Sequence, residues 1–219
     1  MPSLLIAGPT GLIGSTVLQQ ALADPRFTRV EVLSRRGLPR VHPRLVEHVH
    51  ADLLPALPGN GVDAVICCLG TTISKVGGDR ARFIHVDLEL VVELGKWARD
   101  HSVRSMSVVS AVGADIRSRF FYSRVKGDME EALRGLGLPA LHIFQPSVLM
   151  GPRRELRVGE RIGIAVMRML GPLVPCPYRP MQHDVLARAL LRSSLCPGHG
   201  VHTHTHAGIH RLADQNTTD

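Results

Sequence analysis

The sequence predicts an α/β fold, a doubly wound parallel sheet with a small C-terminal lobe, and three observations indicate it. Short apolar segments alternate with longer helical segments, which is typical of parallel strands joined by crossover helices. With 219 residues, 44% of them apolar and 21% charged, the chain can bury one substantial core. A glycine-rich segment, GPTGLIG at residues 8–14, directly follows the first apolar segment.

Strands and helices can be placed in order along most of the chain. Helix-stopping residues mark two helix ends, Asp24-Pro25 after the first helix and the glycines at 135 and 137 after the third. The predicted strands are 3–7, 29–33, 45–50, 64–69, 105–110 and 140–144, and the predicted helices are 12–23, 80–100 and 118–136.

The pattern changes after Pro146. Residues 151–180 are rich in proline and glycine, which favours a small lobe on the substrate side of the sheet over another strand–helix unit. A last helix is predicted at 182–195. The sequence therefore predicts a single domain over residues 1–195, followed by a polar, histidine-rich tail at 196–219.

The glycine-rich segment fits the phosphate-binding turn of a Rossmann-type fold. Such a turn needs a tight bend, a backbone that approaches the pyrophosphate without intervening side chains, and close helix–strand packing. The N-terminus of the following helix offers unpaired N–H groups and a partial positive charge to the anion. The cofactor-binding residues expected here are Gly8, Thr10, Gly11, Leu12, Ile13 and Gly14.

The end of the second predicted strand favours NADP over NAD. Sites for NAD usually place an acid there to bind the ribose hydroxyls, whereas this chain has Ser34, Arg35 and Arg36. Guanidinium groups suit a 2′-phosphate. The alternative is an exposed basic turn. Asp52, after the third strand, is expected either at the adenine edge or as a helix N-cap.

Three further residues predict acid–base chemistry. Tyr122 and Lys126 are four residues apart early in a predicted helix, so both lie on one helical face. A lysine ammonium stabilises the phenolate and makes tyrosine a better proton donor and acceptor near neutral pH. Ser110, at a strand end, is expected to hold a substrate oxygen by a hydrogen bond. The alternative is an ordinary tyrosine–lysine pair on a helix surface.

The chain resembles an atypical short-chain dehydrogenase/reductase of the Tat-interacting oxidoreductase-like subgroup. The resemblance extends to about residue 195, through the glycine-rich turn and the motifs CCLGTT at 67–72, VD at 86–87, SAVGAD at 110–115, FY at 121–122, VKG at 125–127, PSVL at 146–149 and DV at 184–185.

This resemblance implies a Rossmann fold, NADP binding, and Ser110, Tyr122 and Lys126 as the catalytic triad. It also implies that Leu69 and Gly70 lie along the cofactor, that Pro146 and Val148 lie near the nicotinamide, and that Asp87 stands where many short-chain enzymes have asparagine.

The expected function is an NADP-dependent oxidoreductase that reduces a carbonyl or oxidises an alcohol of a small molecule. The alternative is an NADPH-binding sensor that docks a protein partner and has lost its catalytic role. The sequence leaves open a homodimer or a regulatory protein partner.

Charge and hydropathy argue against other classes. The net charge is +7, but the arginines are spread along the chain and aromatics are only 4% of residues, so no nucleic-acid partner is expected. No apolar run reaches the roughly 18–20 residues of a membrane helix. The N-terminal sequence lacks an export signal, and we therefore expect a cytoplasmic protein.

No chemical role is expected for the paired cysteines, the histidines of the tail or the methionines at 167 and 169. Cys67 and Cys68 lie in an apolar strand and are predicted to be core residues, and no metal site is expected from the cysteines. His202, His204 and His206 alternate as strand-borne metal ligands would, but a solvated tail is favoured. Met167 and Met169 are expected to pack in the core rather than line a substrate pocket.

Overall fold

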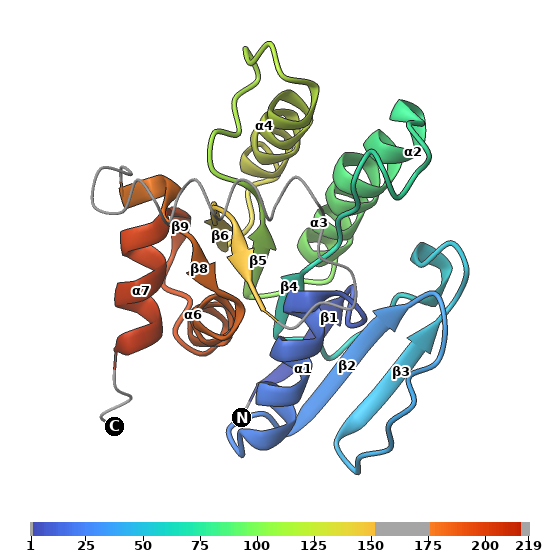
Figure 1. Ribbon diagram of the computed structural model, residues 1–219. Helices are drawn as coiled ribbons and strands as arrows, with labels where there is room; N and C mark the ends of the chain where they lie inside the picture. Colours follow the sequence, from blue (N-terminus) through green and yellow to red (C-terminus); the bar gives the residue numbers. More distant parts are fainter. Residues whose placement is uncertain (1, 152–175, 216–219) are drawn as a thin grey trace.

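The computed structural model describes residues 2–151 and 176–215. Its main feature is a seven-stranded parallel sheet with the strand order β3-β2-β1-β4-β5-β6-β9 (Figure 1). The strands are β1 Ser3–Ala7, β2 Arg29–Ser34, β3 Leu45–Val49, β4 Ala64–Cys67, β5 Ser105–Val109, β6 Ala140–Phe144 and β9 Gly200–His204. The predicted α/β fold with a doubly wound parallel sheet is confirmed.

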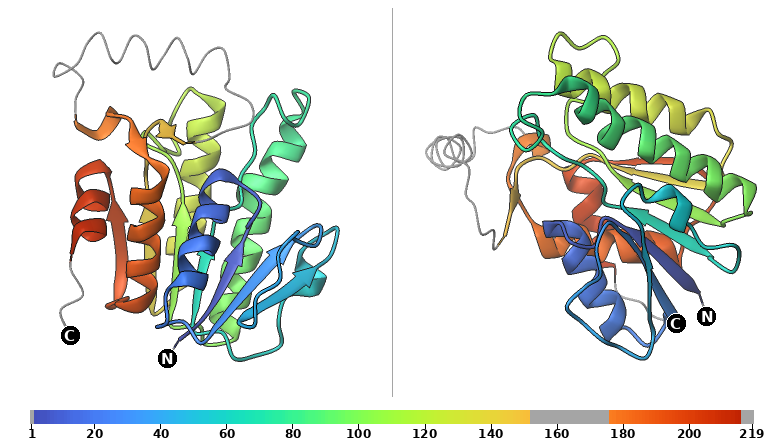
Figure 2. Two further views of the ribbon diagram at one scale, coloured as in Figure 1. Left: turned by 60° about the horizontal axis from the view of Figure 1, so that its bottom comes forward. Right: turned by 90° about the vertical axis from the view of Figure 1, so that its right-hand side faces the viewer.

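Helices cover both faces of this sheet, which gives three layers (Figure 2). The helices are α1 Leu12–Ala23, α2 Arg80–Ile84, the π-helix η2 His85–Glu89, α3 Leu90–Asp100, α4 Phe121–Arg134, α6 His183–Leu195 and α7 His206–Asp214. Short elements complete the description: the 3-10 helices η1 Leu54–Ala56 and η4 Cys176–Tyr178, and the paired strands β7 Leu149–Met150 and β8 Met181–Gln182.

The core divides into two apolar clusters, one on each face. Alternate residues of β1 serve the two faces because successive strand side chains point to opposite sides. Leu4 and Ile6 pack with α1, α6 and α7, whereas Leu5 and Ala7 pack with α3 and α4. On α4 the buried apolar residues repeat every four positions, at Val125, Met129 and Leu133. This spacing fixes which face of α4 is buried, and so where its polar residues point.

The order of the strands reverses between β1 and β4. From β1 the chain proceeds outward to β2 and β3, then crosses back to β4 on the other side of β1. In open α/β sheets the ligand site lies at the carboxyl ends of the strands beside such a switch point. The β1–α1 turn and the segment that follows β4 are therefore the expected walls of a site.

The predicted polar tail is wrong over residues 200–214. Residues Gly200–His204 form β9, which pairs in parallel with β6 and closes the sheet edge, and α7 buries Ile209 completely. The segment is poor in apolar residues, because a strand at the edge of the sheet is only partly covered by other elements. Its composition therefore resembles that of a solvated tail, which explains the wrong prediction. The histidines support the strand: His142 Nδ1 lies 2.9 Å from His204 Nε2, and both rings stack on neighbours.

Two predicted elements differ in detail. The predicted helix 80–100 contains the π-helical turn at His85–Glu89, which helical periodicity does not reveal. The strand predicted at 64–69 ends at Cys67, which leaves Leu69 and Gly70 in a loop at the sheet edge. The apolar segment 162–170, Met167 and Met169, and most of the predicted lobe at 151–180 lie outside the described residues.

Candidate functional site

A cleft of about 1260 Å³ opens at the carboxyl ends of the central strands. Its walls come from segments that are far apart in the sequence but follow neighbouring strands: residues 9–13, 38–40, 68–72, 109–112 and 146–149, with Tyr122 and His183. The cleft therefore lies where the strand order predicts a ligand site.

The turn between β1 and α1 forms one wall and has no room for a side chain at Gly8 or Gly14. Gly8 has φ +80°, and a Cβ on it would lie 2.9 Å from the Cys68 carbonyl oxygen. A Cβ on Gly14 would lie 2.0 Å from the Gly8 carbonyl oxygen. Gly11 is the N-cap of α1 with no side-chain cap, and the first turn of α1 carries no acidic residue. The positive end of α1 is thus available to an anion.

Most of the residues predicted to bind the cofactor lie at this cleft. Gly8 and Gly14 shape the turn, and the lining includes Thr10, Gly11, Leu12, Ile13, Leu69, Gly70, Pro146 and Val148.

The residues predicted to choose the cofactor lie beyond this lining. Ser34 is buried and its hydroxyl donates to the Arg36 carbonyl oxygen at 2.8 Å. Arg35 and Arg36 are exposed at the end of β2, and the segment that continues from them brings Arg40 to the cleft wall. Among the described residues, the arginine that lines the cleft is Arg40, which the sequence analysis did not single out.

Asp52 lies at the surface, outside the residues that line the cleft. Its side chain is 83% exposed and 4.0 Å from His50 Nδ1. The N-cap of the short helix η1 is Leu53, without a side-chain cap, so the alternative prediction that Asp52 caps a helix is wrong.

Tyr122 and Lys126 lie on one face of α4, as their spacing predicts. The Tyr122 side chain lines the cleft and packs its ring against Phe83, with ring centroids 5.9 Å apart. Lys126 is only 3% exposed, one turn deeper. Its Nζ lies 2.8 Å from Asp87 Oδ1, and Asp87 Oδ2 accepts the Thr71 backbone N–H at 2.7 Å.

The charge on Lys126 depends on this partner. Burial of the ammonium acts to lower the pKa of Lys126, but the Asp87 carboxylate and the nearby Tyr122 together outweigh burial and raise it. Because the coupling between two titrating groups is mutual, the Lys126 charge in turn favours the phenolate of Tyr122. The geometry thus suits proton exchange at the Tyr122 hydroxyl.

Ser110 lines the cleft at the end of β5, but its hydroxyl hydrogen is donated inward. Ser110 Oγ lies 2.5 Å from Glu130 Oε1. Glu130 is 6% exposed, and both of its carboxylate oxygens also lie 3.0 Å from Gln145 Nε2, which donates to them. Glu130 and Gln145 were not predicted. The only sequence signal was that Glu130 lies four residues after Lys126, on the same face of the helix.

The prediction that the paired cysteines are core residues of a strand is confirmed for Cys67, whereas Cys68 lies just after β4 and is only half-buried. Cys67 is fully buried in β4, and burial raises its pKa to about 11. Burial also raises the pKa of Cys68, which is half-buried at the cleft wall. Across the described ranges, no group of three or more histidine, cysteine or acidic side chains could hold a metal ion.

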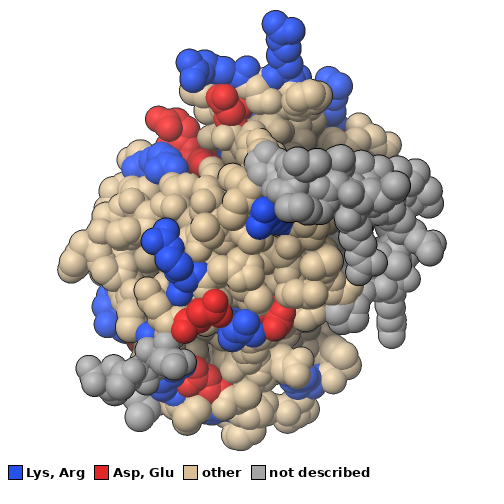
Figure 3. All heavy atoms as spheres, turned by 60° about the vertical axis from the view of Figure 1, so that its left-hand side comes forward, with Lys and Arg blue, Asp and Glu red and all other residues tan. Residues whose placement is uncertain are grey.

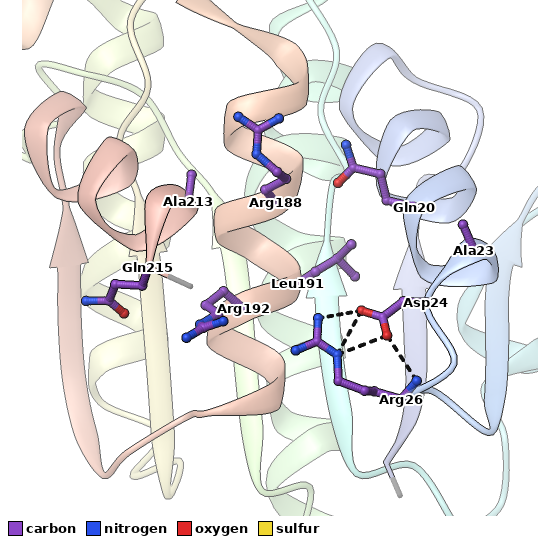
Figure 4. Close-up of a pocket in the computed structure, with 9 residues that line it drawn as sticks. All are labelled: Gln20, Ala23, Asp24, Arg26, Arg188, Leu191, Arg192, Ala213 and Gln215. Atoms are coloured by element: carbon purple, nitrogen blue, oxygen red, sulfur yellow. Dashed lines mark hydrogen bonds and ion pairs between the residues drawn. The ribbon is translucent and has the colours of Figure 1, made fainter. Parts of the chain in front are cut away.

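A second hollow of about 570 Å³ lies at the other end of α1, between α1, α6 and α7 (Figure 4). Three arginines line it, but Arg26 is paired with Asp24 at 2.6 Å and Arg188 with Asp184 at 2.8 Å. On the face drawn in Figure 3, lysine and arginine are scattered among acidic and uncharged residues. Two of the three arginines of the hollow are thus held in local ion pairs, and the described part of this face shows no continuous basic surface.

The sheet topology, the glycine turn at the switch point, and Tyr122 in the same cleft with Lys126 buried one turn below it define a Rossmann-type protein of the short-chain dehydrogenase/reductase class. The chain is 31% identical over 206 residues to HTATIP2 of Rattus norvegicus, covering 90% of this chain and 83% of the relative. It is 34% identical over 172 residues to FMP52 of Eremothecium gossypii, covering 78% and 75%. The chain therefore belongs to the HTATIP2/FMP52 family of atypical short-chain dehydrogenase/reductases, which confirms the resemblance. No family model matches it.

Solved structures share the fold at low sequence identity. WbmH of Bordetella bronchiseptica, in complex with NAD+, has a TM-score of 0.71 and 18% identity, covering 98% of this chain and 79% of that one. MoeE5, in complex with UDP-glucose and NAD, has a TM-score of 0.71 and 14% identity, covering 92% and 75%. At these identities the likeness establishes the fold alone.

The relatives correct the expected location. FMP52 proteins of Eremothecium gossypii, Emericella nidulans and Aspergillus fumigatus are named as mitochondrial. The prediction of a cytoplasmic protein is contradicted, since it rested only on the lack of a recognisable export signal. Within residues 2–151 and 176–215, no helix is both long and apolar enough to cross a membrane.

Proposed function

We propose that this protein is an NAD(P)-dependent oxidoreductase that reduces a carbonyl or oxidises an alcohol of a small molecule. One observation carries the proposal: Tyr122, with the Lys126 ammonium one turn below it, faces the same cleft as the glycine turn. A dinucleotide site and an acid–base group in one cleft are the two requirements of hydride transfer to a carbonyl.

The residues present fit a dinucleotide. The glycine turn leaves backbone N–H groups and the N-terminus of α1 to hold the pyrophosphate, because Gly8 and Gly14 have no space for a Cβ. Leu69 and Gly70 would lie along the cofactor, with Pro146 and Val148 near the nicotinamide, which supplies or accepts the hydride. Relatives by fold such as WbmH bind NAD+, which supports a dinucleotide here.

Tyr122 would exchange a proton between its hydroxyl and the substrate oxygen. Lys126 would stabilise the phenolate of Tyr122 when the proton leaves and hold the cofactor ribose. Ser110 would position the substrate oxygen. As a donor it must first turn away from Glu130, whereas as an acceptor it could already receive the hydroxyl hydrogen of an alcohol.

We further propose NADP rather than NAD as the cofactor. Arg35 and Arg36 replace the acid expected for a ribose diol, and Arg40 stands at the cleft wall close behind them in the sequence. A 2′-phosphate there would meet guanidinium donors that match its oxygens.

The Ser110–Glu130 bond favours a second candidate, an NADPH-binding sensor that docks a protein partner. In that case the cofactor binds but the serine stays committed to Glu130, and turnover is vestigial.

The two candidates are separated by following the absorbance of the reduced nicotinamide while the protein is incubated with panels of small aldehydes, ketones and alcohols. Turnover of any panel member above the protein-free rate supports the oxidoreductase. Tight binding of NADPH in calorimetry without turnover of any member supports the sensor. Failure to bind either NADPH or NADH would overturn both.

A further inference from the structure

Asp87 is a carboxylate in a position that a helix of this kind normally fills with an apolar side chain. The buried face of the continuous helix 80–100 carries Phe83, Leu90, Val91 and Leu94, and Asp87 lies on that face at 1% exposure. It is the only residue of the π-helix His85–Glu89 that is buried. Single π turns inside α-helices are rare, and those that occur are often found at functional sites.

The buried carboxylate joins three elements. Asp87 Oδ1 binds Lys126 Nζ of α4 at 2.8 Å, and Asp87 Oδ2 binds the backbone N–H of Thr71, in the cleft-lining segment after β4. A Cβ on Gly70 would lie 3.4 Å from Asp87 Oδ1 and 3.9 Å from Lys126 Nζ, so the pair lies directly beneath this segment. Asp87 therefore fixes both the lysine and one wall of the cleft.

The titratable groups around Lys126 come from three sides. Asp87 faces it from the π-helix, Tyr122 from the preceding turn of its own helix, and Cys67 from β4. Of these, Asp87 makes the ion pair, and Cys67 is itself held neutral by burial, with a pKa of about 11. A buried ammonium without a counter-charge loses its proton readily, since desolvation disfavours the charged form. The charge on Lys126 thus depends on Asp87.

We propose that Asp87 is a positioning residue, which keeps Lys126 cationic and fixed beside Tyr122 and ties it to the cleft wall at Thr71. The consequence of this inference for catalysis, that Tyr122 exchanges protons beside a permanently charged lysine, rests on the proposed function. The charge control itself is a property of the folded chain and can be measured without substrate.

The chain is well suited to this measurement because it has only three lysines, Lys75, Lys96 and Lys126. Lysine labelled with ¹³C at Cε gives three NMR signals, which Lys75→Arg and Lys96→Arg variants assign. In the wild type, Lys126 is expected to keep its proton to higher pH than an ordinary lysine, whose pKa is about 10.4. In Asp87→Asn its titration midpoint is expected to fall by about 1–3 pH units.

Lys96 provides a matched control within the same protein. It forms an ion pair with Glu93 at 2.7 Å, but both side chains are 46% exposed. Glu93→Gln is expected to move the Lys96 midpoint by less than about 0.5, because solvent screens exposed pairs. A comparable small movement of Lys126 in Asp87→Asn would overturn the proposal.

If Asp87→Asn does not fold, the wild type alone decides. A Lys126 titration midpoint below the ordinary lysine value of about 10.4 would overturn the proposal, and one above it would support it. The outcome is separate from that of the proposed function: lack of turnover with the predicted Lys126 titration contradicts only the enzyme. Tyr122-dependent turnover with an unmoved Lys126 contradicts only the role of Asp87.

Discussion

Ser110 donates its hydroxyl hydrogen to Glu130, with 2.5 Å between Ser110 Oγ and Glu130 Oε1. The bond links the serine of the cleft to a carboxylate that is buried on the inner face of α4 and held from the other side by Gln145. A buried carboxylate is costly unless donors surround it. Ser110 therefore contributes to the stability of the fold as well as to the cleft.

Ser110→Ala is expected to lower the free energy of unfolding by about 1.5–3 kcal/mol, the range for hydrogen bonds to charged groups. Ser107→Ala is the matched control, since Ser107 is a buried serine of the neighbouring strand β5 that bonds a neutral partner, Ser193, at 2.8 Å. It should cost about 0.5–1.5 kcal/mol. Urea unfolding of both variants gives the comparison. Equal losses in the two variants would show that Glu130 is not stabilised by Ser110.

Arg35→Ala is expected to weaken NADPH binding by about 10-fold while leaving NADH binding nearly unchanged, since a charged hydrogen bond at an exposed rim contributes roughly 1.5 kcal/mol. Added salt should weaken NADPH binding more than NADH binding, because it screens the extra phosphate. Calorimetric titration of both cofactors checks this, and Arg40→Ala tests the arginine that lines the cleft. Equal affinity of the wild type for NADH and NADPH would contradict the NADP proposal.

Cys67 is expected to stay unmodified by a thiol reagent in the folded protein, because it has no exposed surface and burial raises its pKa to about 11. Cys68 should react slowly, since burial also raises its pKa. Cys176 and Cys196 are exposed and should react at once. Counting released chromophore before and after unfolding tests this. Four fast-reacting thiols in the native protein would show that the β4 placement is wrong.

The histidines of β6 and β9 predict a loss of stability in acid. Burial lowers the pKa of His142, and burial together with His142 and His202 lowers the pKa of His204 to about 4. The unfolded chain therefore binds protons that the folded chain does not, between the ordinary histidine pKa of about 6.5 and 4. Their contribution is complete above that window and is lost as the pH falls through it.

His204→Gln should flatten this part of the stability profile. The measurement is the urea midpoint of wild type and variant between neutral pH and pH 4, read as a difference so that the carboxylates common to both cancel. A constant difference across that range would show that His204 is not held neutral by the fold.

The elements with strong local signals could be predicted from the sequence. β1, β6 and α1 have the predicted bounds, because each combines a continuous apolar run or helical periodicity with a clear stop. The glycine turn was predictable because the close packing of its backbone requires glycine at particular positions: Gly8 and Gly14 have no space for a side chain.

The rest depends on tertiary contacts. The charged residues around Asp87 have no spacing in the sequence that reveals the π turn. The hydrogen bond between Ser110 and Glu130 joins residues that are 20 positions apart in the sequence. β9 has no apolar pattern of its own, because its stability comes from pairing with β6 and from the histidine stack. Such features become visible only when the sheet has brought distant segments together.

The measurement that tests the central claim most directly compares turnover and NADPH affinity in Tyr122→Phe and Tyr178→Phe. These are the chain's two tyrosines, with similar exposure at 42% and 49%, but only Tyr122 lines the cleft. Tyr122→Phe is expected to bind NADPH within a few fold of the wild type and to lose about 10²–10⁴-fold in turnover, the range of a general acid–base group. Tyr178→Phe should retain both. Turnover that survives in Tyr122→Phe would contradict the account.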